Sequence, residues 1–273
     1  MLLVPGTVHI MFTVLTHVPG TQSGDFMKRI KLEIAYDGTN YCGWQIQPEE
    51  VTVEGILNQA LSKLLNEEIV VIGASRTDSG VHAIRNVAVF DTNTMIPAEK
   101  ICYAVNQHLP WDIRVQNSVE VSKEFHPRRV NSKKTYEYNI LNRSISLPTK
   151  RLYSYFVYYD LDVNAMQEAA GYLIGEQDFK SFCSVKTQVS DTVRRIYDLR
   201  VFKEQDIIKI KVTGNGFLYN MVRIIVGTLI EVGRGAKSPK DIEKMLSGLD
   251  RGLAGPTAPA HGLTLVNIEY DNK

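Results

Sequence analysis

Residues 27–38 read MKRIKLEIAYDG, and this stretch sets the fold class. Large apolar side chains stand at every second position from Ile30 to Tyr36, an alternation that predicts a half-buried β-strand. Asp37-Gly38 then gives a turn signal that ends the strand. Apolar residues next recur at helical spacing over 53–65, with Thr52 in position to cap that helix.

The pattern continues outward as a repeat. The first half reads strand, helix, strand, strand, helix and strand, with the last four near 69–73, 86–90, 98–108 and 113–121. The second half repeats this order, with strands near 136–140, 193–202, 206–213 and 263–268 and helices near 163–173 and 217–232. A short helix is added at 239–247, with Ser238 as its cap and Pro239 in its first turn.

The repeat predicts an α+β fold made of two ferredoxin-like, or RRM-like, β-α-β-β-α-β domains. We assign residues 27–125 to an N-terminal domain and residues 126–273 to a C-terminal domain. Each domain would have an antiparallel sheet with helices on one face. The two sheets are expected to flank a central basic cleft.

Residues 1–26 differ from the rest of the chain. They contain no Lys or Arg, and Pro5 and Pro19 interrupt their apolar stretch. A secretory signal needs a basic start and an unbroken apolar core, and a membrane span needs a longer one. We therefore expect a leader that is unstructured or lies before the true start at Met27, in a protein without a membrane anchor.

Cysteine usage indicates the compartment. The three cysteines, Cys42, Cys102 and Cys183, are odd in number and far apart, and they form no Cys-x-x-Cys pair. This spacing argues against a disulfide scaffold or a zinc site and is typical of a reducing cytoplasm. No His-Glu-x-x-His metal motif occurs either, so no metal is expected.

The formal net charge of +1 hides a segregated distribution. Residues 123–151 hold eight Lys and Arg against two Glu, a net charge of +6, which leaves −5 on the remaining residues. A solvated basic surface is the plainer interpretation. Aromatic side chains within and beside the segment, such as Tyr136 and Tyr153, also suit RNA, because bases stack on rings while cations hold phosphates.

The loop GASRTDSGVHA, residues 73–83, carries the sharpest chemical signal. Asp-Ser-Gly alone is more typical of a tight turn. The alternative is catalytic: Arg76 stands two residues from Asp78, and a nearby cation favours the ionised carboxylate that a nucleophile requires. A hydrolase triad of Ser75, His82 and Asp78 is disfavoured, because no Gly-x-Ser-x-Gly elbow accompanies it.

Arg223 lies in the most apolar helix pattern of the chain, FLYNMVRIIVGTLIEV. It could extend to the surface, as many arginines do. If the helix packs under the sheet, its charge must meet an anion, since an unpaired buried charge is costly. A loop aspartate from the other half is a reasonable candidate.

These motifs together resemble the TruA-type tRNA pseudouridine synthase family. The resemblance is carried by YDG (36–38), YCGWQ (41–45), GASRTDSGVHA (73–83), FHPR (125–128), KKTYEY (133–138), GEQDFKSF (175–182), GNGFLYNMVRIIVGTLIEVGRG (214–235) and GPTAPAHGLTL (255–265). It covers essentially all of residues 27–273. Pro127 and Gln177 depart from the family pattern, which often has Ala and His there, without touching the presumed chemistry.

The resemblance implies an isomerase that acts on uridines 38, 39 and 40 of the tRNA anticodon stem-loop. Asp78 would be the nucleophile, Arg76 would displace the target base, Tyr136 would stack on it, and Arg223 would pair with the aspartate. The family works as a homodimer without cofactor or metal. Arg128, Lys133 and Lys134, in the basic segment, would bind tRNA.

One competing class is a non-catalytic RNA-binding protein with two RRM-like domains. The Lys/Arg-Gly-Phe type of RNP signature is missing from the sequence. A pure binder would also have no use for the Arg-Thr-Asp loop. Conversion of uridine in tRNA would distinguish the two classes.

Overall fold

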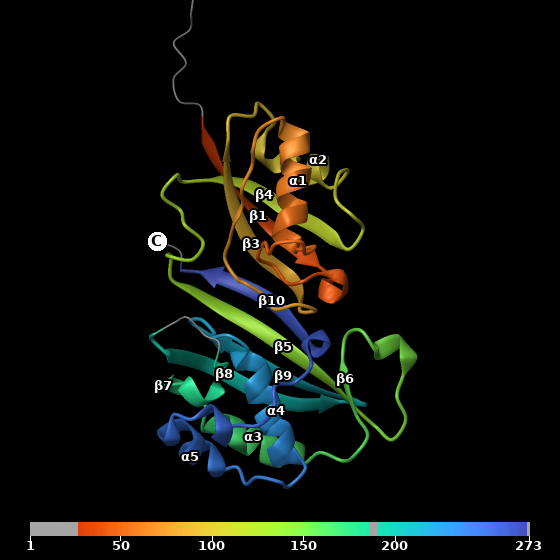
Figure 1. Cartoon of the computed structure of the whole chain (residues 1–273), viewed down its shortest axis with the longest axis vertical. Helices are drawn as coiled ribbons and strands as arrows, with labels where there is room; N and C mark the ends of the chain where they lie inside the picture. The colour runs from red at the N-terminus through yellow and green to blue at the C-terminus, as the bar shows by residue number, and fades with distance from the viewer. Residues whose placement is uncertain (1–26, 186–189, 272–273) are drawn as a thin grey trace, which may run out of the picture.

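A computed structural model describes residues 27–185 and 190–271 of the chain (Figure 1). The expected leader at 1–26 lies outside the described residues. The fold is mixed α+β, which confirms the predicted class at that level, with five α-helices among the described residues. Each of those helices is too short or too polar to traverse a lipid bilayer.

The ten strands of the described residues form one sheet rather than two separate ones, in the order β4-β1-β3-β10-β5-β9-β8-β7, with β2 on β3 and β6 on β5. The expectation of two sheets flanking a cleft is therefore wrong. The strands are β1 Lys28–Tyr36, β2 Ile72–Gly73, β3 His82–Thr92, β4 Ile113–Val121, β5 Ser132–Asn142, β6 Tyr155–Val157, β7 Gly175–Asp178, β8 Val193–Glu204, β9 Ile207–Gly214 and β10 Leu263–Tyr270.

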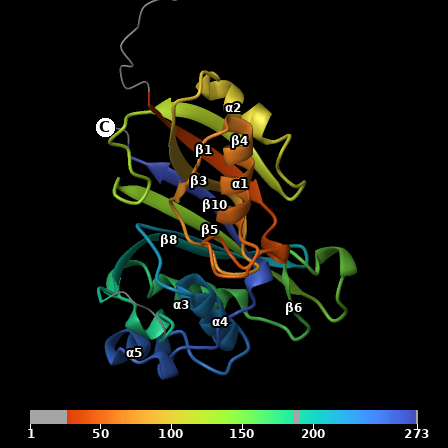
Figure 2. The same cartoon turned by 45° about the horizontal axis from the view of Figure 1, so that its top comes forward.

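Strand β10 is what joins the two halves of the chain. It pairs antiparallel with β5 along its length and parallel with β3 through Thr264 opposite His82 and Leu265 opposite Ala83. Figure 2 shows β10 running between these two strands. Periodicity alone identifies strands but not their distant partners, which is why the sequence did not predict this junction.

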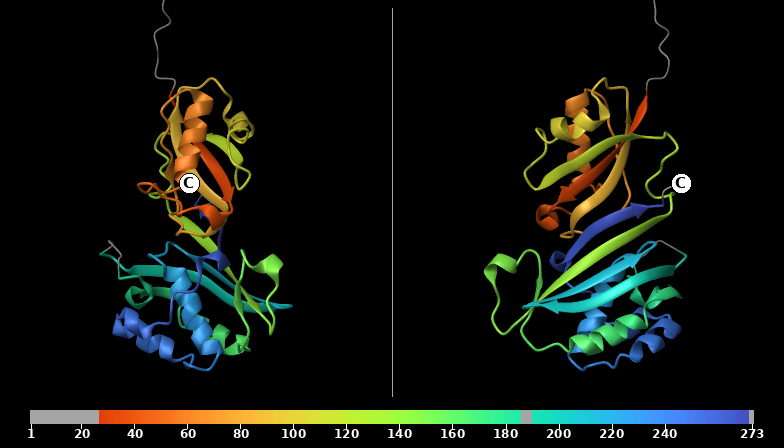
Figure 3. Two further views of the ribbon diagram at one scale, coloured as in Figure 1. Left: turned by 45° about the vertical axis from the view of Figure 1, so that its right-hand side comes forward. Right: turned by 180° about the vertical axis from the view of Figure 1, so that it is seen from behind.

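Alternating burial shows which face of the sheet is covered. In β1 and β9 every second residue is buried, and the residues between are only partly so. The helices α1 (Val53–Leu65) and α4 (Met221–Gly233) lie on the front face in Figure 1, and the view from behind has the strands foremost (Figure 3, right). The remaining helices are α2 Ala98–Val105, α3 Val163–Gly171 and α5 Asp241–Gly248.

Element boundaries differ from the predictions at several ends. Thr52 caps α1 as predicted, because its side chain accepts a hydrogen bond from the Gly55 N–H. Helix α4 begins at Met221 rather than at 217, because Asn220 adopts a left-handed φ of 60°. Ser238 is not the cap of α5: its N–H donates to the Asp241 side chain, and the helix begins at Asp241.

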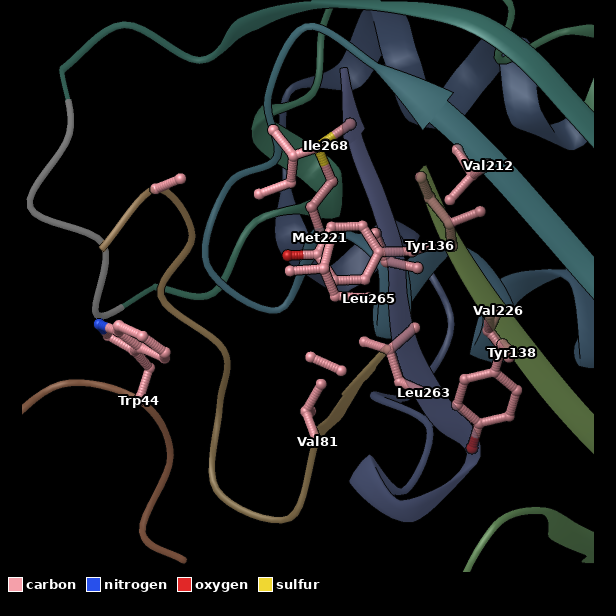
Figure 4. Packing of buried hydrophobic residues seen from close by; sticks show 14 of the residues in the cluster. Trp44, Val81, Tyr136, Tyr138, Val212, Met221, Val226, Leu263, Leu265 and Ile268 are labelled. Carbon is pink, nitrogen blue, oxygen red and sulfur yellow. The ribbon is translucent and has the colours of Figure 1, made fainter. Parts of the chain in front are cut away.

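The buried side chains form one hydrophobic cluster that crosses the junction. Figure 4 shows Leu263 and Leu265 of β10 with Val81 on one side and Tyr136 and Tyr138 of β5 on the other. The two halves therefore share a core as well as a sheet.

Candidate active site

The Asp78 loop, residues 74–81 between β2 and β3, is a turn held by Tyr36 and by the Gly43-Trp44 segment. The Tyr36 hydroxyl and the Thr77 hydroxyl lie 2.8 Å apart, and the backbone N–H of Trp44 donates to the Thr77 carbonyl at 3.0 Å. Gly43 makes this approach possible: its φ is +84°, and a Cβ there would stand 2.6 Å from the Thr77 oxygen. Turn chemistry thus fixes the loop, and it leaves the Asp78 side chain facing a cleft.

Arg223, in the first turn of α4, meets Asp78 across the junction. Its Nη1 lies 3.2 Å from Asp78 Oδ2, and it also donates to Asn220 Oδ1 at 2.9 Å. Its Nε donates to the Ala258 carbonyl at 2.7 Å. The side chains of Arg223 and Asp78 are 17% and 22% exposed, so Arg223 does not extend to solvent and Asp78 is its anion.

The loop that supplies Ala258 packs directly on α4. The Ala258 N–H donates back to the Arg223 carbonyl at 3.0 Å, and the Gly255 N–H donates to the Thr228 hydroxyl at 2.9 Å. Gly227 allows the contact, since a Cβ there would lie 1.7 Å from the Pro256 oxygen. The loop is therefore held against α4, and its Ala258 carbonyl is fixed in place to accept from the Arg223 guanidinium.

The electrostatics of Asp78 are balanced between two opposing effects. Burial raises the pKa of the Asp78 carboxyl above its ordinary value, and the charge and hydrogen bond of Arg223 act against this rise. The cation that supports the carboxylate is thus Arg223. The family resemblance implied this pairing, whereas the local spacing had suggested Arg76, which is exposed at the cleft.

Tyr136 forms one wall of the same cleft. Its ring stands edge-on to Phe217, with centroids 5.3 Å apart and an angle of 88°. Burial raises the pKa of Tyr136 to about 12. A hydrogen bond with Ser75 opposes this rise, and the charge of Asp78 adds to it. The phenol therefore stays neutral, and the residue lines the cavity.

The cleft has a volume of about 600 Å³. Its lining includes Asp78, Arg76, Tyr136 and Arg223. The other lining residues are Cys42, Gln45, Gln47, Glu50, Thr77, Ser79, Val81, Arg194, Phe217, Leu218, Tyr219, Asn220, Met221, Val222 and Leu263. The four residues expected to be catalytic therefore lie together. Arg194 was not predicted; the alternation of β8 could have shown which face it shares.

The basic segment does not form one patch. Strand β5 lies in the middle of the basic segment and has 11 residues, so it extends over about 35 Å. The basic residues before β5 and those after it are therefore far apart. Lys134 shares a face with Tyr136 and donates to the Ala74 carbonyl at 3.0 Å. Lys133 points to the opposite face, where its Nζ lies 5.3 Å from the Tyr197 ring centroid, and Arg128 is exposed near one end of the strand.

His82 does not form a hydrolase triad with Ser75 and Asp78. Its Nδ1 accepts from the Gly38 N–H at 3.1 Å, and its Nε2 lies 2.9 Å from the Leu152 carbonyl. These contacts occupy both ring nitrogens of a buried imidazole. Within the described part of the chain, no group of three or more His, Cys, Asp or Glu side chains could hold a metal ion.

Comparison with known proteins points to one family. A sequence model described as tRNA pseudouridine synthase matches residues 33–128 and 169–271. A tRNA pseudouridine synthase A of Ruminiclostridium cellulolyticum is 51% identical over 245 residues, and one of Thermoanaerobacter sp. (strain X514) is 48% identical over 244 residues. Each alignment covers 89% of this chain and 100% of the relative.

Proposed function

The chain belongs to the tRNA pseudouridine synthase family and is an isomerase, and from this premise we propose that it converts uridines 38, 39 and 40 of the tRNA anticodon stem-loop to pseudouridine. The observation that carries the proposal is the Asp78–Arg223 pair beside Tyr136 in one cleft. Asp78 is the nucleophile in this proposal.

The reaction rearranges one nucleotide without gaining or losing atoms. The N1–C1′ bond breaks, a C5–C1′ bond forms, and the proton leaving C5 is balanced by one gained at N1. A single carboxylate suits attack at either C6 of the uracil or C1′ of the ribose. Arg223 supports this role because it opposes the effect of burial and favours the ionised Asp78 that attack requires.

The target base must first leave the helical stack, at a cost of a few kcal/mol. We assign this displacement to Arg76, which is exposed at the cleft and has no ion-pair partner within 4.0 Å among the described residues. Tyr136 then stacks on the flipped uracil. Its neutral phenol and its contact with Phe217 suit a rigid stacking surface that holds the detached base while it rotates.

For the fold, we propose two ferredoxin-like units joined edge to edge, with a boundary near residues 125 and 126. Support comes from the strand order: β4-β1-β3 with β2 on β3 in the first unit, and β10-β5-β9-β8 in the second. Each order is that of a β-α-β-β-α-β unit in which the fourth strand lies beside the first.

We also propose that the protein is a cytoplasmic homodimer that needs no cofactor and recognises the anticodon arm. These points rest on the family. Light scattering at several protein concentrations would test the dimer: a mass near twice 30.8 kDa is expected.

The deciding experiment incubates the protein with unmodified tRNA transcripts and maps new pseudouridines. Conversion at positions 38 to 40 supports the proposal. A protein that binds tRNA without converting any uridine would instead fit the competing class of non-catalytic RNA-binding proteins.

A further inference from the structure

Three cations converge on the cleft face of the sheet beside the Asp78 loop: Lys134, Arg194 and Arg128. The register of the sheet brings Lys134 and Arg194 together. Lys134 of β5 is opposite Gly214 of β9, and Gly214 is opposite Ile196 of β8. Residues opposite one another share a face, so the side chains of Lys134 and Ile196 point to the same face of the sheet. Arg194 stands two residues from Ile196 and therefore shares that face, where it lines the cleft.

Arg128 approaches Lys134 from the other side. On β10, Ile268 is opposite Lys134, and Tyr270 is two residues further along the same face. The Tyr270 hydroxyl donates to the Pro127 carbonyl at 3.1 Å. This contact holds Pro127, the residue before Arg128, beside Tyr270 near the Ser132 end of β5.

The cluster has little compensating negative charge. Among the ion pairs within 4.0 Å between described residues, none involves Lys134 or Arg128. Arg194 reaches only Asp191, at 3.9 Å, and that carboxylate is 73% exposed. Burial, with the charges of Arg128 and Arg194 adding to it, lowers the pKa of Lys134 to about 8. Such mutual repulsion is relieved by a bound anion.

The cluster is also tied to the site. Lys134 Nζ donates to the carbonyl of Ala74, at the start of the Asp78 loop, and has two further N–H groups to give. Lys134 stands two residues, about 7 Å, from Tyr136 along β5. Phe217, which contacts Tyr136, covers Gly214 between Lys134 and Arg194: a Cβ on that glycine would lie 3.1 Å from its ring.

We propose that Lys134, Arg194 and Arg128 form a phosphate-binding subsite that holds the RNA backbone beside the target nucleotide. The inference rests on the proposed function and deepens it. The three residues act as positioning residues: a phosphodiester bound here fixes the strand while the neighbouring base enters the cleft. Lys and Arg are the side chains that bind phosphate in this way.

The test measures binding of an unmodified tRNA transcript at several salt concentrations. Lys134→Gln and Arg194→Gln remove charge and keep a hydrogen-bond donor. We expect each to weaken binding about tenfold, the value of one charge-assisted contact. We also expect each to make the slope of log K against log salt shallower by about 0.7 to 0.9, the value for one phosphate contact.

Neighbouring residues supply matched controls. Arg195→Gln and Arg200→Gln each remove one charge from an exposed position of β8, the strand of Arg194, where the side chains face away from the cleft. We expect both controls to keep the parental affinity and slope. Lys134→Arg, which restores the charge, is expected to recover the slope.

Equal slopes for Lys134→Gln, Arg194→Gln and the two controls would overturn the subsite. Thermal denaturation checks that each variant is folded. If Lys134→Gln does not fold, Arg194→Gln alone tests the subsite, and Lys134→Arg shows whether a cation at position 134 is needed for folding. The readout is independent of catalysis. A parent protein that forms no pseudouridine overturns the proposed function, whereas an unaltered slope overturns the subsite.

Discussion

Asp78 and Arg223 are 145 residues apart in the sequence and 3.2 Å apart in the fold. The sequence predicted that a charge in such an apolar helix needs an anion if it is buried. It did not identify the anion from residues alone, because the partner depends on how distant elements pack. Lys133 and Lys134 are the opposite case: the two-residue period of a strand already implies that neighbours face opposite ways.

Asp78→Asn removes the proposed nucleophile while keeping the shape of the side chain. We expect pseudouridine formation to fall by on the order of 10³-fold or more, with tRNA affinity nearly unchanged. Single-turnover conversion and a binding titration measure the two effects. Asp206→Asn, which changes an exposed carboxylate paired with Arg143, serves as the control. Conversion at the parental rate in Asp78→Asn would refute the nucleophile.

Arg223→Met removes the cation that opposes the effect of burial on Asp78. The pKa of Asp78 should therefore rise further, and the carboxylate should form only at higher pH. We expect the acid side of the pH–rate profile to move to higher pH, and Arg223→Lys to retain part of the parental profile. If the acid limb of both variants stays at the pH of the parent protein, Arg223 does not act on Asp78.

At the scale of elements, periodicity located the helices well and their ends less well. The predicted helix at 217–232 begins four residues late because Asn220 turns left-handed, and this turn brings its side chain to Arg223. The predicted strand at 69–73 shortens to Ile72–Gly73 because pairing, rather than apolar content, defines a strand. Local pattern does not report such tertiary requirements.

Two helical glycines allow a matched test of how α4 supports the site. Gly227→Ala places a Cβ against the Pro256 carbonyl, so the loop that holds Arg223 must move. We expect the free energy of unfolding to fall by about 1–3 kcal/mol or more, and pseudouridine formation to be lost. Gly171→Ala meets nothing within 4 Å and should change stability by between 0 and about +1 kcal/mol.

Chemical denaturation and a conversion assay measure both variants. A stable and active Gly227→Ala protein would mean that the loop does not rest on α4 as closely as the structure has it. Strong destabilisation by Gly171→Ala would indicate that any substitution of a helical glycine harms this fold.

At the scale of the whole molecule, the largest departure from the sequence expectation is the single sheet. The repeat of the pattern predicted which segments are strands in each half, and most of those segments are strands. The parallel pairing of β10 with β3 links segments about 180 residues apart, as the His82–His261 contact shows with its separation of 179. No local signal encodes a contact of this range.

Leu265→Ala tests whether β10 holds both halves. Leu265 is fully buried in the junction, so we expect a loss of about 2–5 kcal/mol. Hydrogen exchange should increase in β3 and in β5, which flank β10 on its two sides. Val201→Ala in β8 is the control, and its effect should be concentrated in the second half. Faster exchange in only one half of Leu265→Ala would mean that the halves are stabilised separately.

The place of β10 in the chain also has a consequence during synthesis. Strand β5 ends at Asn142 and β10 ends at Tyr270, so 128 more residues must be added after β5 before β10 is complete. At about 5–20 residues per second the ribosome takes roughly 6–26 s to cover that distance. Until then the facing edges of β3 and β5 stay open, and Asp78 and Arg223 have no strand between them to set their spacing. A nascent chain released too early would therefore be inactive and prone to aggregate, so the fold itself restricts activity to finished copies.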